Sequence, residues 1–355
     1  MEFGLSEEQT LLQDSVTRYL DANCPLDRVR RFAEEASAPD LQSGLAELGV
    51  FGLLVPEDTG GVGLGCFEAA LVAEALGSHT APVAYLGSAV MAPLAITLAG
   101  DGHTETLSRL ATGELSVGVA VAEFVGARAD GGISANGGTL TGKALSVLDF
   151  DAQAYLVADA AGHSYLVEAS APGVTAEALP TIDKTRLTGA LTLNRAPAQL
   201  ISDDPQVLAR VIDAGRVMLA ADTLGAAQNM LDQAVEYANQ REQFNRPIGS
   251  FQAVKHMCAE MAAGLEPCRA MVWYASHALD ALPGEASVSA CHAKAHLSEV
   301  GKFVAKTATE VHGGMGFTDL LGLHYWFKRI GYNRQMLGAP ELLREQAARL
   351  QGLCA

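Results

Sequence analysis

Two segments in the C-terminal half hold residues suited to binding a diphosphate. The first runs from Arg241 to Gln252 and reads Arg-Glu-Gln-Phe-Asn-Arg-Pro-Ile-Gly-Ser-Phe-Gln. Arg241 offers a planar fork of donors that can meet two oxygens at once, which a lysine cannot do. Gln243 can add an amide donor, and Phe244 can add an apolar wall. The segment predicts a helix end, a tight turn and a new helix start.

The second segment is His312–Phe317, which reads His-Gly-Gly-Met-Gly-Phe. Gly313 and Gly314 have no side chains, so their backbone N–H groups could approach an oxyanion closely. A simpler alternative for the first segment is a surface ion pair between Glu242 and Arg246, four residues apart on a helix. That pair alone does not account for the proline and aromatic residues that follow.

Metal and thiol chemistry are poorly supported. His292, His296 and Glu299 share one helical face at a spacing that could ligate a metal. No further ligand lies nearby, and neighbouring lysines such as Lys294 favour an amphipathic surface, so we predict no metal site. The chain has 6 scattered cysteines without a Cys-x-x-Cys motif, as expected of reduced thiols in a cytoplasmic protein.

The composition predicts a globular protein and excludes several partners. The chain has 355 residues, of which 49% are hydrophobic and 18% charged, with a formal net charge of −17. Such a charge argues against binding nucleic acid or an anionic membrane surface. The most apolar run, residues 81–99, is interrupted by Pro82, Gly87 and Pro93, so it predicts a buried helix rather than a membrane span. The acidic N-terminus lacks the basic start of a signal peptide.

The elements that must position these residues fall into three zones. Residues 1–113 have helical periodicity, residues 114–200 are rich in alternating β-branched residues, and residues 201–355 are helical again. Two β-rich runs, 154–158 and 164–168, flank a short turn and predict a hairpin. We expect a helical domain, a middle β-barrel or sandwich, and a C-terminal helical bundle. Helices are predicted at about 251–282, 288–311 and from 340 onward.

With the motifs and this order of elements together, the chain resembles the acyl-CoA dehydrogenase family. The resemblance covers nearly the whole chain and is most specific in the two C-terminal segments. It implies an α+β fold with a helical domain, a β domain and a four-helix bundle, and it implies FAD as cofactor. The residues that match the family's FAD pyrophosphate contacts, often made across a subunit interface, are Arg241, Gln243, Phe244, Gln252, Gly313 and Gly314. Glu310 does not match, because relatives usually have a neutral glutamine there.

The resemblance also shows what is missing. Dehydrogenation of an acyl thioester needs a carboxylate that removes the α-proton while flavin accepts the β-hydride. The two positions where the family places this base hold Leu337 and Gly215, so we predict no catalytic residue. Glu341 would substitute only if its helix began early enough to share a face with Leu337. Asp213 points away from Gly215 on a helix, and we expect both acids to be solvated.

Other parts of the family's site are partly kept or lost. Asp213 and Arg216 keep a spacing that relatives use near the CoA thioester, so the resemblance implies a vestigial substrate pocket. The segments that surround the flavin ring in relatives correspond here to Ala122–Asp130 and Lys143–Val147. Their hydroxyl and indole groups are mostly absent, with Ser146 as the only remnant.

This asymmetry resembles the non-catalytic subunits of the α2β2 acyl-CoA dehydrogenases that degrade steroid and bile-acid side chains. It implies a base-bearing paralogous partner, an acyl-CoA substrate and an electron acceptor like electron-transfer flavoprotein. Three alternatives stay open. The chain could be a self-sufficient homotetramer that uses Glu341, a flavin-free scaffold on this fold, or a flavin monooxygenase or desulfinase that needs no α-proton base.

Overall fold

The N-terminal part of the chain is helical. The computed structural model describes residues 4–35, 41–100, 102–121 and 132–354. Ser6 and Gln9 form a capping box at the first helix, as their spacing predicts. The helices are α1 (Glu7–Asn23), α2 (Leu26–Glu35), α3 (Leu41–Glu47), α4 (Cys66–Ser78), α5 (Ala92–Ala99) and α6 (Thr104–Ala111), with a π-helical turn η3 (Leu86–Met91) before α5.

The middle part is an eight-stranded β-sheet that folds around a hydrophobic core separate from the main core. The strands are β1 (Val117–Ala120), β2 (Gly132–Asn136), β3 (Thr139–Leu148), β4 (Ala154–Ala158), β5 (Ser164–Glu168), β6 (Val174–Ala178), β7 (Thr188–Pro197) and β8 (Gln199–Ser202). Their order is β6-β7-β3-β1-β4-β5-β8, with β2 paired to β3. Among the strands of the described residues, only the β1–β4 pair is parallel, and the predicted hairpin is the β4–β5 pair.

The hydrophobic core of the β domain lies between two parts of the same sheet. Side chains from both halves of the sheet form one buried cluster, which includes Ile133, Leu140 and Leu191 from one half and Tyr155 and Val167 from the other. Alternating apolar residues on these strands point inward and meet, as in a sandwich or barrel. The expectation of a β-barrel or sandwich between two helical parts is confirmed.

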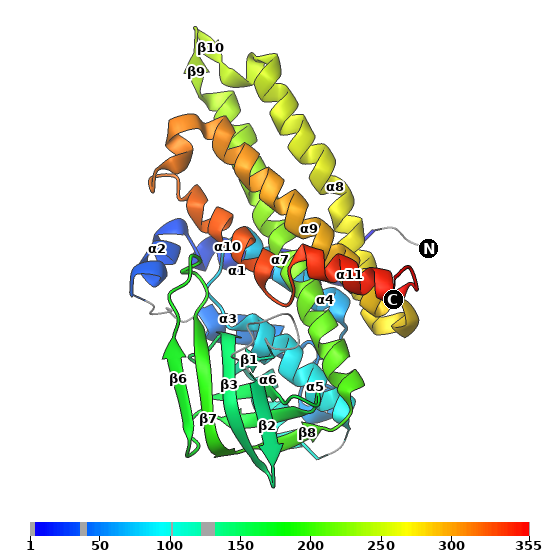
Figure 1. The fold of residues 1–355 in the computed structure, drawn as a ribbon. Helices are drawn as coiled ribbons and strands as arrows, with labels where there is room; N and C mark the ends of the chain where they lie inside the picture. The colour runs from blue at the N-terminus through cyan, green and yellow to red at the C-terminus, as the bar shows by residue number, and fades with distance from the viewer. Residues whose placement is uncertain (1–3, 36–40, 101, 122–131, 355) are drawn as a thin grey trace.

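The C-terminal part is a helical bundle that carries both candidate segments. Its helices are α7 (Pro205–Gln240), α8 (Gln252–Ala281), α9 (Pro283–His312), α10 (Leu323–Gln335) and α11 (Pro340–Leu350). The three long helices pack on one another, α10 packs on α7 and α9, and α11 packs on α9. Helix α7 extends from the sheet to a small hairpin at the opposite end of the molecule (Figure 1).

Residues 81–99 form part of the main core, as predicted. Met91 and Ile96 in this run are buried, and η3 and α5 pack against α7. Among the described residues, no helix is long and apolar enough to cross a membrane. The domain limits 1–113, 114–200 and 201–355 remain a prediction.

Candidate functional site

The predicted turn between α7 and α8 is a β-hairpin. Strands β9 (Glu242–Gln243) and β10 (Arg246–Pro247) pair antiparallel, and Phe244 and Asn245 join them with φ values of 54° and 58°. Positive φ at both central residues is the geometry of a tight hairpin turn, but it strains a residue with a side chain. Phe244 is nevertheless an aromatic residue that is 87% exposed. A strained, exposed aromatic side chain is typical of a binding site.

The alternative of a helical Glu242–Arg246 ion pair is wrong. Glu242 lies opposite Pro247 in the hairpin rather than one turn from Arg246 on a helix. The guanidinium carbon of Arg246 lies 4.0 Å from the ring centre of Phe251, a cation–π contact. Arg246 is therefore part of the hairpin's own structure.

Three predicted binding residues lie at the base of the hairpin. Arg241 ends α7, where its N–H donates to the Tyr237 carbonyl and its own carbonyl accepts from Ile248, both at 2.8 Å. Its guanidinium is exposed and has no hydrogen-bond or ion-pair partner in the described part of the chain. Gln243 is exposed and donates to a neighbouring backbone carbonyl, and Gln252 is the exposed first residue of α8. All three side chains are accessible to a ligand.

The glycine segment lies at the end of α9. Its 3₁₀ turn, Gly313–Phe317, follows His312, whose ring stacks on Tyr237 of α7 with centroids 4.6 Å apart. The contact ties the end of α9 to the end of α7, next to the hairpin. A Cβ added to Gly313 or Gly314 would meet nothing within 4 Å. The φ of 57° at residue 313 favours glycine, but no contact with the described residues requires glycine at 314.

Glu310, the residue that departs from the family pattern, lies on α9 just before this glycine segment. Its carboxylate is exposed and pairs with Lys306 at 3.6 Å. The lysine offsets part of the negative charge near the segment, although surface pairs of this kind are weak. A phosphate in this region would therefore meet Glu310 beside a lysine rather than alone.

The two positions that could hold a base face each other. Leu337 is 4% exposed, and a Cβ added to Gly215 would lie 2.6 Å from Leu337 Cδ1 and 2.9 Å from Met91 Sδ. Leu337 has a φ of 52° and Gly338 one of 110°. Neither Leu337 nor Gly215 can accept a proton, and the space between them is occupied by apolar atoms.

Asp213 and Arg216 form a buried ion pair. Arg216 Nη1 lies 2.9 Å from Asp213 Oδ1, and Arg216 Nε donates to the Leu337 carbonyl at 3.0 Å. Ser287 donates to the other Asp213 oxygen at 2.5 Å. The expectation of a solvated Asp213 is wrong, because Arg216 and Ser287 compensate for its desolvation.

Glu341 lies apart from Leu337. Helix α11 begins at Pro340, so Leu337 is outside it and the two residues do not share a helical face. The carboxylate of Glu341 is 67% exposed and lies 2.9 Å from Arg334. Its pKa is lowered, first by hydrogen bonding to its own backbone at the helix start and also by Arg334. A solvated carboxylate with a lowered pKa is a poor general base for this reaction.

Lys294 contradicts the predicted amphipathic surface. Its side chain is 1% exposed in the interior of α9, and its Nζ lies 3.3 Å from Ser298 Oγ and 3.4 Å from the Arg334 carbonyl. Burial, together with the nearby Arg216 and Arg334, lowers the pKa of Lys294 to about 7. No group of three or more histidine, cysteine, aspartate or glutamate residues that could hold a metal is found in the described ranges.

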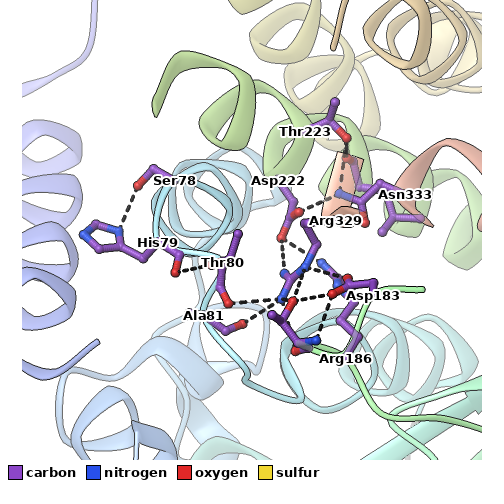
Figure 2. A network of polar contacts seen from close by, with 12 residues as sticks. Ser78, His79, Thr80, Ala81, Asp183, Arg186, Asp222, Thr223, Arg329 and Asn333 are labelled. Atoms are coloured by element: carbon purple, nitrogen blue, oxygen red, sulfur yellow. Dashed lines mark hydrogen bonds and ion pairs between the residues drawn. The ribbon is translucent and has the colours of Figure 1, made fainter. Parts of the chain in front are cut away.

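The sequence reasoning missed a buried network centred on Arg329 (Figure 2). Arg329 Nε lies 3.0 Å from Asp183 Oδ2, and Arg329 Nη1 lies 3.1 Å from Asp222 Oδ2. Asp222 also pairs with Arg186 at 2.7 Å and accepts a hydrogen bond from Asn333 at 2.6 Å. A signal was present, because Asp222 is the only charged residue between Arg216 and Asp232 on α7.

The predicted ring-side segments are only partly visible. Ala122–Asp130 lies outside the described residues. Lys143–Val147 lies on β3, where the pairing with β7 is irregular between Ala144 and Val147 and Ser146 has a φ of 55°. The backbone of this stretch therefore departs from regular strand geometry.

Models of two protein domains match separate parts of the chain. The model "Acyl-CoA dehydrogenase, N-terminal domain" matches residues 6–114, and "Acyl-CoA dehydrogenase, C-terminal domain" matches residues 206–351. The acyl-CoA dehydrogenase IpdE2 of Mycolicibacterium smegmatis is 33% identical over 98% of this chain and 99% of its own length. FadE27 of Mycobacterium tuberculosis, also named an acyl-CoA dehydrogenase, is 30% identical over 92% of each protein.

Solved structures agree with the fold. A chain of the ChsE4-ChsE5 complex from Mycobacterium tuberculosis is 28% identical, with a TM-score of 0.91 and full coverage of both chains. The Tcur3481-Tcur3483 steroid ACAD G363A variant is 28% identical, with a TM-score of 0.89 over 98% of each chain. On the match of both domain models and the similarity to full-length relatives, the chain belongs to the acyl-CoA dehydrogenase family.

Proposed function

We propose that this chain is the non-catalytic subunit of a heterotetrameric FAD-dependent acyl-CoA dehydrogenase. A base-bearing paralogue supplies the flavin-ring pocket and the catalytic carboxylate. This chain supplies contacts to the pyrophosphate of the partner's FAD. The substrate class is the CoA ester of a steroid or bile-acid side chain, and the electron acceptor resembles electron-transfer flavoprotein.

The observation that carries this proposal is the contrast between the two ends of the bundle. At one end, Leu337 is buried against Gly215, and neither residue can take a proton. At the other end, Arg241 and Phe244 are exposed on the hairpin, with no partner in the described part of the chain for the guanidinium. A chain that can hold the cofactor but cannot deprotonate a substrate needs a partner that can.

The residues present fit the diphosphate of FAD. Arg241 can form paired, charge-assisted hydrogen bonds with phosphate oxygens. Gln243 and Gln252 offer amide donors, and Gly313 and Gly314 leave backbone N–H groups open to approach. Phe244 can cover an aromatic part of the cofactor. When bound, FAD supplies the hydride acceptor for oxidation of the Cα–Cβ bond, and this chain's residues bind and orient it.

Two similar solved structures support the pairing and the substrate class. One is the ChsE4-ChsE5 complex, and the other is the Tcur3481-Tcur3483 steroid ACAD variant. The buried Asp213–Arg216 pair is a candidate remnant of a thioester-binding site.

The test is co-expression of this chain with a paralogue that bears a carboxylate at the position of Leu337. Arg241→Ala in this chain should remove charge-assisted hydrogen bonds of about 1.5–3 kcal/mol, which weakens FAD binding about 10–100-fold. Flavin absorbance of the purified complex measures retention. Arg349→Ala is the matched control, because Arg349 is an exposed arginine that pairs with Glu345 on α11.

Two outcomes would overturn the proposal. The first is full activity of this chain alone with a saturated acyl-CoA, and the second is unchanged FAD content in the Arg241→Ala complex. Glu341→Gln tests the self-sufficient alternative. We expect the activity of the complex to be unchanged, because Glu341 is solvated and paired with Arg334.

A further inference from the structure

Three apolar groups meet where the two base positions converge. Gly215 lies on α7, Met91 ends η3, and Leu337 lies in the loop between α10 and α11. Leu337 Cδ1 would be 2.6 Å from a Cβ at position 215, and Met91 Sδ would be 2.9 Å away. The Leu337 side chain therefore fills the space in front of Gly215, and no larger residue fits at 215 while it stays there.

This space is where an acyl chain would have to lie. A base at either position must come within about 2.6–3.2 Å of the proton that it removes or be bridged to it by a single water. If a base at position 215 or position 337 deprotonated the α-carbon of a substrate, that carbon would lie between the two positions. The acyl chain would then lie next to Met91. In this chain the Leu337 side chain occupies that volume.

The loop directs the Leu337 side chain towards Gly215 in an unfavourable backbone conformation. A left-handed conformation at φ 52° is unfavourable for leucine. Two buried side chains hold the backbone here, because Arg216 donates to the Leu337 carbonyl at 3.0 Å and Lys294 contacts the carbonyl of Arg334, in the last turn of α10, at 3.4 Å. Leu337 is therefore strained, held at its carbonyl by Arg216 and only 4% exposed, so its side chain has a defined position.

We propose that Leu337 is a built-in plug that closes the acyl-chain cavity of this chain. The chain then has no acyl-CoA site of its own, and removal of the leucine side chain opens a cavity for a short acyl group. The proposal rests on the proposed function in one respect, since it gives each pair of subunits a single acyl-CoA site, on the partner.

The experiment compares three forms of the full-length chain, purified without FAD or a partner. The probe is butyryl-CoA, whose acyl chain is about the size of a leucine side chain, titrated by calorimetry beside CoA without an acyl group. Leu337→Gly also suits the positive φ, so it opens the cavity while relieving strain. We expect butyryl-CoA to bind Leu337→Gly at least about tenfold more tightly than the unaltered chain, with CoA affinity unchanged.

Leu337→Met is the matched control, because it keeps a side chain of similar volume and should bind like the unaltered chain. Thermal melting and gel filtration establish that each variant is folded, and Leu337→Ala replaces the glycine variant if that one does not fold. A folded cavity variant without a gain in butyryl-CoA affinity overturns the plug, as does an unaltered chain that binds butyryl-CoA more tightly than CoA. Neither result depends on FAD or a partner, so failure here is distinguishable from failure of the proposed function.

Discussion

At the scale of single residues, the most unusual group is the amine of Lys294. It is 1% exposed, and its contacts in the described part of the chain are a hydroxyl and a backbone carbonyl rather than a carboxylate. Burial, reinforced by Arg216 and Arg334, lowers its pKa to about 7 from an ordinary value of 10.5. A charged amine without a counter-ion is costly to bury, so Lys294 is unfavourable to folding when protonated.

The lowered pKa of Lys294 predicts a pH dependence of stability. Between pH 7 and pH 10.5 the unfolded chain binds this proton and the folded chain does not, so the stability contribution of this residue rises with pH through that window. Lys294→Met should therefore raise Tm, by about 2 °C or more at pH 6–7, and the gain should shrink towards pH 10. Thermal melts at several pH values check this. An equal gain at every pH would refute it, and exposed Lys302→Met is the control.

At the scale of elements, one helix start is capped from a distant part of the chain. Gly65 precedes α4 and has no side chain to accept hydrogen bonds from the first turn. Asp280 at the end of α8 does so instead, with Oδ1 2.8 Å from the Cys66 nitrogen and Oδ2 3.1 Å from the Phe67 nitrogen. A Cβ at position 65 would lie 2.5 Å from the Asp280 carboxylate, which explains the glycine. The cap joins the N-terminal helices to the bundle.

Asp280→Ala tests this cap. The substitution leaves two N–H groups at the start of α4 without their acceptor, so the free energy of unfolding should fall by about 1 kcal/mol, within the usual range of 0.5–2 kcal/mol for lost caps. Urea denaturation measures the change. Asp232→Ala is the control, because Asp232 is an exposed aspartate on α7, and a change of less than about 0.5 kcal/mol is expected there. Equal effects of the two substitutions would contradict the cap.

At the scale of the whole molecule, the Arg329 network joins all three parts of the chain (Figure 2). Arg329 lies on α10 and Asp222 on α7, Asp183 belongs to the connection between β6 and β7, and the carbonyls of Thr80 and Ala81 come from the N-terminal part. Burial alone would raise the pKa of Asp222, but the adjacent cations lower it below its usual value. The network therefore connects the three parts of the chain through buried ion pairs and hydrogen bonds, and we call it the ionic joint.

Arg329→Met should weaken this joint strongly. Removal of the guanidinium leaves Asp183 and Asp222 buried with fewer partners, so the free energy of unfolding should fall by about 3–5 kcal/mol. A second substitution, Asp183→Asn, should recover part of the lost free energy of unfolding, because it neutralises a buried carboxylate whose partner Arg329 has been removed. Urea denaturation at neutral pH measures both, with Arg349→Met as the exposed control. A loss below about 1 kcal/mol for Arg329→Met would show that the joint is unimportant.

Local pattern was sufficient to predict much of the fold. The two β-rich runs Ala154–Ala158 and Ser164–Glu168 around a short turn predicted the β4–β5 hairpin, because β-propensity and turn composition are local properties. The absence of a base at Leu337 and Gly215 was a prediction from the family resemblance together with the residue types at these two positions. The burial of Lys294 was missed because its charge was given more weight than its position, three or four residues from the apolar Ala290, Cys291 and Leu297 on α9.

By itself, the sequence determined which groups the chain has for chemistry, namely an arginine–aromatic segment, a glycine segment and no carboxylate at either base position. Only the tertiary structure decided that Gly215 and Leu337 touch, although they are far apart in sequence, and that Asp222, Asp183 and Arg329 share one buried network. The physical reason is that side-chain identity is local, whereas burial and pairing depend on which distant elements pack together.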